Sequence, residues 1–533
     1  MGRYFNPGNF GFQEALNSLI YVDKTGIIGF VNSVLNTKQK FMTVSRARRF
    51  GKSMATELLA AYYSKGCDSR ELFKGLKAET LPTFEKELNK NNVIFFDFQA
   101  FWGRSKLDHE ENRVLEFIQR SVISELHESY PGLVSEKETN LPEALNRINA
   151  STNEQFIVII DEWDCIFREG KDKITLQKEY INFLRSMFKG TDAEHSIKLA
   201  YLTGILPIKK YGTQSALNNF KDYTMVRPCQ MAEYVGFTEE EVKGLCERFD
   251  MDFEECRRWY DGYSFENAKS IYNPNSVVEA MFSHEFGSYW TKTDTYKVLS
   301  EYISLNFDGL RDDIITMLGG GACRVTPDKF QNDMVSINSK DDAMTLLVHL
   351  GYLAYNSSTG KAKIPNGEIA AEFAIAVEDK KYWGEIANAL EKSEDLLDAV
   401  MEGNSDFVAH QLSLVHSDSS SILTYNNENS LACAVTIAFY TAFKYYSVFR
   451  ELDSGKGFAD MVYIPRPGCD RSALLIELKY NKDADSAIRQ IKEKRYSGRL
   501  SHYNGNILLI GINYDKESKQ HSCVIENLEG QKL

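Results

Sequence analysis

Long apolar runs alternate with helical patterns in the first part of the chain. Strand-like runs cover 40–45, 92–98, 154–164 and 197–205, and a helix is predicted over 54–64. Near-continuous apolar strands separated by helices are typical of a parallel sheet that is covered on both faces. The pattern therefore predicts a parallel α/β domain in this part of the chain.

The pattern changes after about Pro228. Short amphipathic helices are predicted there, one of them over 272–282 with Asn275 or Ser276 as its N-cap. Between 296 and 378 the predicted order is helix, strand, turn, strand, helix, which is the order of winged-helix modules. Because this segment is acidic, we favour a spacer without a ligand over a nucleic-acid-binding wing.

The last part of the chain has a mixed pattern. It follows a polar, Ser/Asn-rich stretch over 417–430, inside which we place a domain boundary. The elements predicted after it are helices over 431–446 and 484–495 and strands over 458–464, 472–480 and 506–513. A second α/β domain is therefore expected.

Composition adds limits to this picture. The 533 residues exceed one compact core, and 43% of them are hydrophobic, which excludes a disordered or collagen-like chain. With 62 Lys and Arg against 75 Asp and Glu the net charge is −13, which argues against a general nucleic-acid coat but not against a local basic site.

Cysteine usage and hydropathy indicate in which cellular compartment the protein works. The nine cysteines are scattered and form no C-x-x-C pair, which favours a reducing compartment over a disulfide framework or a zinc finger. The sequence shows neither a signal-peptide pattern nor an apolar run of about 18 residues, the minimum for a membrane span. We expect a cytoplasmic protein without a membrane partner.

A basic loop joins the first predicted strand to the helix over 54–64. Its end, Gly51-Lys52-Ser53, matches the end of the phosphate-binding pattern G-x-x-x-x-G-K-[ST], whereas Arg46 stands where that pattern has its first glycine. Gly51 lets the backbone approach a phosphate, Lys52 can neutralise its oxygens, and Ser53 can ligate Mg²⁺. The alternative is a basic loop that caps a helix, but four cations over 46–52 repel each other unless an anion binds.

The third apolar strand runs into Asp161-Glu162. A strand that ends in two carboxylates can place Asp161 on Mg²⁺ and Glu162 on an attacking water. An exposed acidic strand end is the simpler alternative, which the presence of both motifs in this order disfavours. The fourth strand ends near Thr203, whose hydroxyl is a candidate for sensing the γ-phosphate of a nucleotide.

A second constellation lies in the C-terminal part. Glu477 and Lys479 are two apart in a predicted strand and therefore share a face. If the preceding strand pairs with it as a hairpin, Asp460 meets Glu477. Two carboxylates beside a lysine can hold Mg²⁺ and orient a water. The alternative is a solvated ladder of cross-strand ion pairs. Glu428, before the helix over 431–446, is either a further metal ligand or a charge that stabilises a helix N-terminus.

These motifs resemble the bacterial AAA-ATPase-like family, whose members typically carry a C-terminal PD-(D/E)XK nuclease domain. The resemblance rests on YVDKT (21–25), RRFGKS (48–53), IDEWD (160–164), LTGI (202–205), YNP (272–274) and IPN (364–366), and it covers nearly the whole chain. The family usually has proline before its two arginines, where this chain has Ala47. The resemblance implies that Arg48 and Arg49 bind nucleotide and that Gln490, on a basic helix, lies beside the nuclease metal.

The resemblance also implies the organisation and the activity. We expect a multidomain α/β protein with a P-loop ATPase domain (1–227), a helical lid (228–295), a winged-helix-like middle region (296–420) and a restriction-endonuclease-like domain (421–533). The expected function is ATP binding and hydrolysis that regulates a Mg²⁺-dependent nuclease acting on DNA. RNA as substrate and a homo-oligomeric assembly stay open. The alternatives are an ATP-driven switch or adaptor whose nuclease fold only binds, and a nuclease with a static nucleotide.

Overall fold

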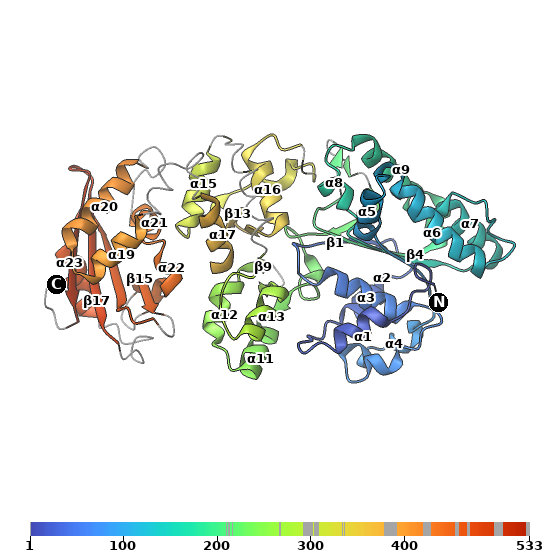
Figure 1. Cartoon of the computed structure of the whole chain (residues 1–533), viewed down its shortest axis with the longest axis horizontal. Coiled ribbons are helices and arrows are strands. Elements are labelled where there is room, and N and C mark those ends of the chain that lie inside the picture. Colours follow the sequence, from blue (N-terminus) through green and yellow to red (C-terminus); the bar gives the residue numbers. More distant parts are fainter. Residues whose placement is uncertain are drawn as a thin grey trace. The chain divides into compact units, whose positions relative to one another are not determined.

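The computed structural model has two compact units, which we describe separately (Figure 1). Unit 1 comprises Met1–Phe253, Tyr260–Glu285 and Arg324–Ala362, and unit 2 comprises Glu254–Trp259, Phe286–Cys323 and Lys363–Leu533. The structure describes residues 2–208, 210–211, 214–215, 217–265, 268–290, 302, 307, 309–332, 334, 336–377, 392–418, 428–453, 458–465, 469–494 and 505–528.

Unit 1 is built on a five-stranded parallel sheet, as predicted. Its order is β2 (Asn92–Asp97), β3 (Phe156–Asp161), β4 (Ile197–Gly204), β1 (Phe41–Ser45) and β7 (Lys221–Tyr223). Every residue of β1 and β3 is buried, which explains why these strands are apolar throughout. The carboxyl ends of β1, β3 and β4 lie side by side, so residues far apart in the sequence meet there.

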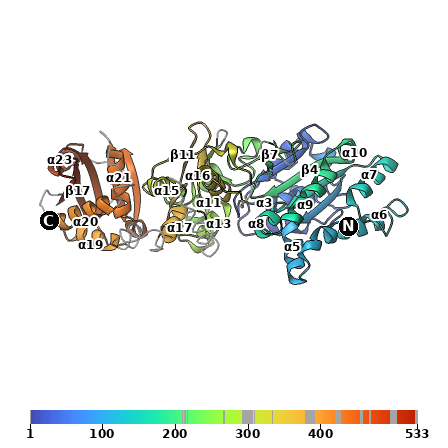
Figure 2. The same cartoon turned by 90° about the horizontal axis from the view of Figure 1, so that it is seen from above.

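Helices cover both faces of this sheet (Figures 1 and 2). On one side lie α1 (Phe10–Leu16), α2 (Ile27–Val34), α3 (Lys52–Tyr63) and α4 (Phe84–Glu87). On the other side lie α5 (Phe98–Leu107), α6 (Val114–Ser129), α7 (Leu141–Thr152), α8 (Cys165–Glu169) and α9 (Ile174–Phe188), and α10 (Thr191–Ser196) leads into β4.

Local sequence fixes where several of these helices begin. The carboxylate of Asp97 accepts hydrogen bonds from the backbone N–H groups of Gln99 (2.8 Å) and Ala100 (3.3 Å) and so caps α5. The side chain of Asn140 caps α7, where Pro142 fits because the first turn needs no backbone donor there. Polar side chains therefore fix where these two helices begin.

The outer edge of β2 is covered by the N-terminal segment. The N–H of Phe95 donates to the carbonyl of Tyr4 (2.8 Å), and the N–H of Asn6 donates to the carbonyl of Val93 (2.7 Å). Three backbone N–H groups at positions 3–5 donate to the carboxylate of Glu125 on α6, at 2.7–2.9 Å. This carboxylate therefore holds the segment against the sheet.

The rest of unit 1 contains smaller sheets. One is antiparallel with the order β8 (Phe237–Thr238), β10 (Ala268–Tyr272), β9 (Tyr263–Phe265), next to α11 (Glu239–Phe249) and α13 (Pro274–Ser283), so this region is not wholly helical. β5 (Lys210–Tyr211) and β6 (Gln214–Ser215) form a short antiparallel pair. A three-stranded sheet has the order β11 (Cys323–Arg324), β13 (Lys361–Lys363), β12 (Ala354–Asn356), with β11 before α16 (Lys340–Leu350) and the other two strands after it. The predicted order helix, strand, turn, strand, helix is present, and it ends with α17 (Gly367–Val377).

Unit 2 is built on a mixed five-stranded sheet in sequential order. Its strands are β14 (Tyr446–Asp453), β15 (Phe458–Pro465), β16 (Ala473–Tyr480), β17 (Ile507–Asp515) and β18 (Gln520–Asn527), and only β16 and β17 pair in parallel. Its helices are α15 (Leu310–Leu318), α17, α19 (Ser393–Met401), α20 (Ser405–Asp418), α21 (Glu428–Ala438), α22 (Ala442–Tyr445) and α23 (Ala484–Lys494). In Figure 2 this sheet carries the label β17, and the label α23 marks the helix that packs on it.

Two predictions for this sheet were incomplete. The expected helix over 431–446 is broken after α21, and residue 446 already begins β14, a strand that the hydrophobic pattern did not indicate. The strand β18 was not predicted either. Within the described residues, no helix combines the length and the hydropathy that a membrane crossing requires. The four predicted regions differ from the two compact units and stay a prediction.

Candidate active sites

The basic loop lies between β1 and α3, as the P-loop pattern predicts. Gly51 has φ 88°, in the left-handed region that favours glycine, and α3 begins at the next residue. The side chain of Lys52 is only 4% exposed. Its Nζ donates to the carbonyl of Ala47 (3.1 Å) and lies 3.7 Å from Oε1 of Glu162. Arg48, Arg49 and Ser53 are exposed beside it.

Arg46 does not belong to this cluster. Its side chain is completely buried, and the guanidinium donates to the carbonyls of Ser45 (3.0 Å), Tyr223 (3.2 Å) and Met231 (3.1 Å). The guanidinium also lies 5.7 Å from the ring centroid of Phe265, and burial lowers the pKa of Arg46 to about 10. The expectation that Arg46 helps to attract an anion was wrong, because its charge is taken up by backbone carbonyls.

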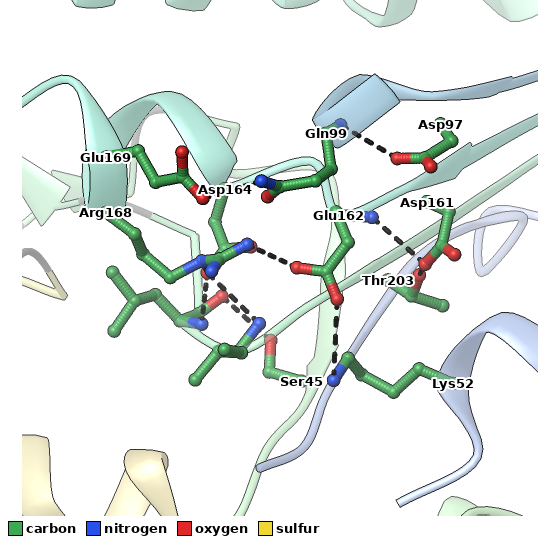
Figure 3. Close-up of polar contacts among 12 residues, drawn as sticks. Ser45, Lys52, Asp97, Gln99, Asp161, Glu162, Asp164, Arg168, Glu169 and Thr203 are labelled. Atoms are coloured by element: carbon green, nitrogen blue, oxygen red, sulfur yellow. Dashed lines mark hydrogen bonds and ion pairs between the residues drawn. The ribbon is translucent and has the colours of Figure 1, made fainter. Parts of the chain in front are cut away.

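The carboxylate of Asp161 contacts two other predicted residues, of which Figure 3 labels Thr203. The hydroxyl of Thr203 on β4 donates to its Oδ1, and Ser53 on α3 also forms a side-chain hydrogen bond with it. Burial raises the pKa of Asp161, and these two hydrogen bonds oppose that shift. Asp161, Ser53 and Thr203 therefore form one cluster, with oxygen ligands of the type that Mg²⁺ prefers.

Glu162 lies between two cations. Its side chain is 21% exposed, Lys52 approaches Oε1, and Arg168 on α8 donates to Oε2 (Figure 3). Burial acts to raise the pKa of Glu162, but the charges of Lys52, Arg168 and Arg48 outweigh it and hold the pKa below its ordinary value. Glu162 is thus held as a carboxylate, the form that a general base needs.

Three residues of this site were not identified from the sequence. Asp97 ends β2 in register with Asp161 on β3, and burial together with the charge of Asp161 raises its pKa to about 6. Asp164 and Arg168 follow the Asp-Glu pair and contact each other, with 3.1 Å between Nε and Oδ2. A signal existed for Asp97, since it ends an apolar strand just as Asp161 does, whereas the only sequence signal for Arg168 is its spacing of four residues from Asp164.

The residues of the YVDKT motif hold another part of unit 1. Asp23 accepts hydrogen bonds from the backbone N–H groups of Thr25 (2.8 Å) and Lys77 (2.7 Å). Lys24 forms an ion pair with Glu241, the capping-box residue of α11, and donates to the carbonyl of Glu233 (2.7 Å). The motif therefore fastens α11 to the part of unit 1 that precedes α2.

The C-terminal constellation centres on Glu477 in β16. Its side chain is 1% exposed, and one oxygen, Oε1, accepts hydrogen bonds from Lys479 (3.1 Å) and from Gln490 on α23. Asp460 on β15 accepts a hydrogen bond from the backbone N–H of Leu478 (2.7 Å), which places its carboxylate beside β16. The predicted hairpin is present, because β15 and β16 pair antiparallel.

A glycine allows α23 to bring Gln490 to this carboxylate. Gly511 on β17 lies opposite Glu477, and a Cβ atom at Gly511 would meet the carbonyl oxygen of Ala484 at 2.3 Å. Since Ala484 begins α23, only glycine lets this helix pack so closely on the sheet. Helix packing and strand register together therefore bring Glu477, Lys479 and Gln490 into contact.

The structure describes only some of the remaining residues near the second cluster, which are Glu428 and the basic residues on and after α23. α21 begins at Glu428, whose side chain lies outside the described part of the structure, as do residues 495 and 499. Arg489 contacts Asp483 (3.4 Å), and Lys492 is paired with Glu526. Within the described side chains, no three His, Cys, Asp or Glu residues gather closely enough to hold a metal ion by themselves. Glu428 as a metal ligand stays a prediction.

Comparison with known families agrees with this geometry. Residues 12–213 match a family described as predicted AAA-ATPase, and residues 426–523 match the PD-(D/E)XK nuclease superfamily. The chain combines an AAA-ATPase-like segment with a PD-(D/E)XK nuclease-like segment. These matches confirm the predicted resemblance, and each segment contains one of the two clusters described above.

Individual similar proteins add little information on function. An uncharacterized protein in the vnfD 5' region of Azotobacter chroococcum mcd 1 is 23% identical over 531 residues, with 95% of each chain covered. Among solved structures, the Aeropyrum pernix ORC2 protein has a TM-score of 0.29 and 11% identity, covering 69% of this chain and 98% of that one. The ORC1 protein of the same organism, in complex with DNA, has a TM-score of 0.22 and 11% identity over 72% of this chain and 98% of that one. Both TM-scores are too low to support an inference.

Proposed function

We propose that this chain binds and hydrolyses ATP in unit 1 and uses the nucleotide state to regulate a Mg²⁺-dependent nuclease in unit 2 that acts on DNA. The observation that supports this most is that each unit brings predicted site residues from separate elements into contact. Lys52, Ser53 and Asp161 meet at the carboxyl edge of a parallel sheet, and Glu477, Lys479 and Gln490 meet on the second sheet.

In unit 1 each residue has a distinct role. Lys52 binds the β- and γ-phosphate oxygens, helped by the exposed Arg48 and Arg49 and by the backbone after Gly51. Ser53 and Asp161 supply oxygen ligands for Mg²⁺, and Thr203 senses the γ-phosphate through the same carboxylate. Glu162 accepts a proton from the attacking water.

In unit 2 the two carboxylates are the metal ligands. Asp460 and Glu477 offer the oxygen donors that a hard cation requires, and Mg²⁺ bound there would lower the pKa of a water and stabilise charge at phosphorus. Lys479 orients the attacking water, while Gln490 holds the carboxylate of Glu477. Glu428 is proposed as a further ligand, since α21 begins there.

The compartment, the partner and the assembly are part of the proposal. No disulfide joins the eight cysteines whose side chains the structure describes, which fits the reducing interior of the cytoplasm. DNA is the proposed partner because residues 426–523 match the PD-(D/E)XK nuclease superfamily, and RNA is tested beside it. A homo-oligomer is the proposed assembly if nucleotide binding needs a residue supplied in trans.

The test is cleavage of plasmid DNA by the purified full-length chain with Mg²⁺, with and without ATP. The wild type should cut, and ATP should change the rate, while Glu477→Ala/Lys479→Ala should lose at least about 100-fold in rate. The matched control is Glu526→Gln, a buried acid of the same sheet that is paired with Lys492 outside the cluster.

The outcomes separate the proposal from its alternatives. Equal cleavage by wild type and the double variant would show that the cluster is not the nuclease site. ATP turnover that Lys52→Ala abolishes, without cleavage of DNA or RNA under any divalent metal, would instead identify an ATP-driven switch or adaptor. Cleavage that responds to ATP without phosphate release would identify a static nucleotide, and Glu162→Gln is the control for that measurement.

A further inference from the structure

Arg168 lies between two carboxylates in unit 1 (Figure 3). It belongs to α8, and its side chain is 6% exposed. Its Nη2 donates to Oε2 of Glu162, and its Nε donates to Oδ2 of Asp164 at 3.1 Å. A planar guanidinium that reaches two fixed acceptors has little freedom left, so its position is defined by both partners.

Asp164 is itself fixed by the sheet. It is fully buried, and its Oδ2 also accepts hydrogen bonds from the backbone N–H groups of Ile205 (3.1 Å) and Leu206 (2.7 Å), directly after β4. Gly204 permits this approach, because a Cβ there would lie 2.6 Å from Oδ1 of Asp164. The backbone after β4 therefore holds Asp164, Asp164 holds Arg168, and Arg168 holds Glu162.

The two oxygens of Glu162 have different partners. Oε2 bonds to Arg168, which is buried and anchored, whereas Oε1 lies 3.7 Å from Nζ of Lys52. In the proposed function Lys52 binds the phosphates, so Oε1 then becomes available to a water while Oε2 keeps its bond. A general base that is oriented by a third group is a recurring arrangement in hydrolytic sites.

We propose that Arg168 is a positioning residue of the ATPase site, which holds Oε2 of Glu162 so that Oε1 faces the attacking water. This inference rests on the proposed ATP hydrolysis by unit 1. Its rival is a structural role, in which Arg168 only joins α8 to the sheet and Glu162 finds its position without it. The two roles differ in one respect, since a positioning residue acts only through the residue that it positions.

The experiment is a double-mutant cycle on the full-length chain, read by single-turnover ATP hydrolysis and by ATP affinity. Arg168→Gln should slow hydrolysis by about 10- to 100-fold and leave the Kd for ATP within about twofold, because misplacing a catalytic group costs rate more than binding. In the Glu162→Gln background the same change should have an effect below about twofold.

Control variants guard against a trivial loss of structure. Lys198→Gln removes a partly buried ion pair with Glu87 at the opposite end of β4 and should leave hydrolysis unchanged. Arg168→Lys keeps a cation that reaches one carboxylate at a time, so its rate of hydrolysis should lie between those of wild type and Arg168→Gln. This variant also tests the inference if Arg168→Gln fails to fold. A rate for Arg168→Lys equal to that of wild type would count against the inference.

The remaining outcomes distinguish the inference from the proposed function. If the effect of Arg168→Gln is the same with and without Glu162, or if ATP affinity falls in parallel with the rate, the positioning role is overturned while ATP hydrolysis stands. If wild type does not hydrolyse ATP at all, the proposed function fails and the inference falls with it.

Discussion

The central carboxylates of the two clusters have different numbers of cationic partners. In unit 1 the carboxylate of Glu162 is held by Lys52 and Arg168, with Arg48 close enough to influence it. In unit 2 the carboxylate of Glu477 has one cation, Lys479, and the neutral amide of Gln490. Several cations around one carboxylate suit a site that takes up a polyphosphate, and a carboxylate with a single cation suits a divalent metal.

The two clusters also differ in how the fold assembles them. In unit 1 the residues come from the carboxyl ends of parallel strands, so Ser53, Asp161 and Thr203 meet although they are far apart in the sequence. In unit 2 a hairpin and the next helix suffice, and Asp460, Glu477 and Gln490 lie within one short stretch. The first site therefore depends on the whole sheet, and the second on local register and one close helix contact.

The largest expected effect comes from removing the lysine of each cluster. Lys52→Ala should lower ATP turnover by at least about 100-fold, because it removes the main charge for the phosphates, and cleavage should keep its ATP-free rate but lose its response to ATP. Lys479→Ala should lower cleavage by about 100-fold and leave ATP turnover within about twofold. Its metal affinity should rise, because a cation that competes for Glu477 is gone.

Matched lysines serve as controls for that comparison. Lys40, at the opposite end of β1, is buried and donates to backbone carbonyls, and Lys492 is paired with Glu526 in unit 2. Lys40→Ala and Lys492→Ala should leave both activities nearly unchanged. Phosphate release, plasmid cleavage and metal titration are the measurements. If Lys52→Ala and Lys479→Ala affected both reactions alike, the two clusters would not be separate sites.

A smaller effect is expected from restoring the glycine of the phosphate-binding pattern. Arg46→Gly should weaken unit 1 by about 3 kcal/mol, because three carbonyls lose a charged donor. Arg49→Gly, at an exposed position with φ 66°, should change stability by less than about 0.5 kcal/mol. Thermal unfolding of the two variants checks this. An unchanged midpoint for Arg46→Gly would mean that its buried charge does not support the loop.

The smallest effect concerns Asp97. Its pKa is raised from 3.8 to about 6 by burial and by Asp161, so the folded chain loses stability as pH rises from about 4 through 6. Asp97→Asn should therefore raise the melting temperature near pH 8 and not near pH 4, since asparagine can still cap α5. Melting in EDTA at several pH values is the measurement, and a gain that does not depend on pH would contradict the assignment.

Much of this architecture could be predicted because burial leaves a trace in the sequence. β1 and β3 are apolar throughout since both faces are covered, and the residues that follow them form the cluster of unit 1. The Asp460 hairpin was predictable from the alternation around Glu477 and Lys479. The local sequence pattern was enough to predict a residue's place wherever that place depends only on its own strand.

The rest depends on partners that sequence does not show. Arg46 belongs to a run of cations by sequence, but in the structure it lies among carbonyls of segments almost 200 residues away. Arg168 looks like an ordinary helix cation paired with Asp164 four residues earlier, and only the fold brings the backbone after β4 to Asp164. The break between α21 and β14 is likewise tertiary, since the N–H of Thr441 donates to Ser393.

The segment that covers the edge of β2 has a consequence for handling this protein. Without residues 4–6, β2 would present a row of free backbone donors and acceptors beside the apolar side chains of Val93 and Ile94. Such an exposed strand can pair with the same strand of another molecule and start aggregation. Removal of residues 4–6 would therefore affect solubility first, before either cluster loses its geometry.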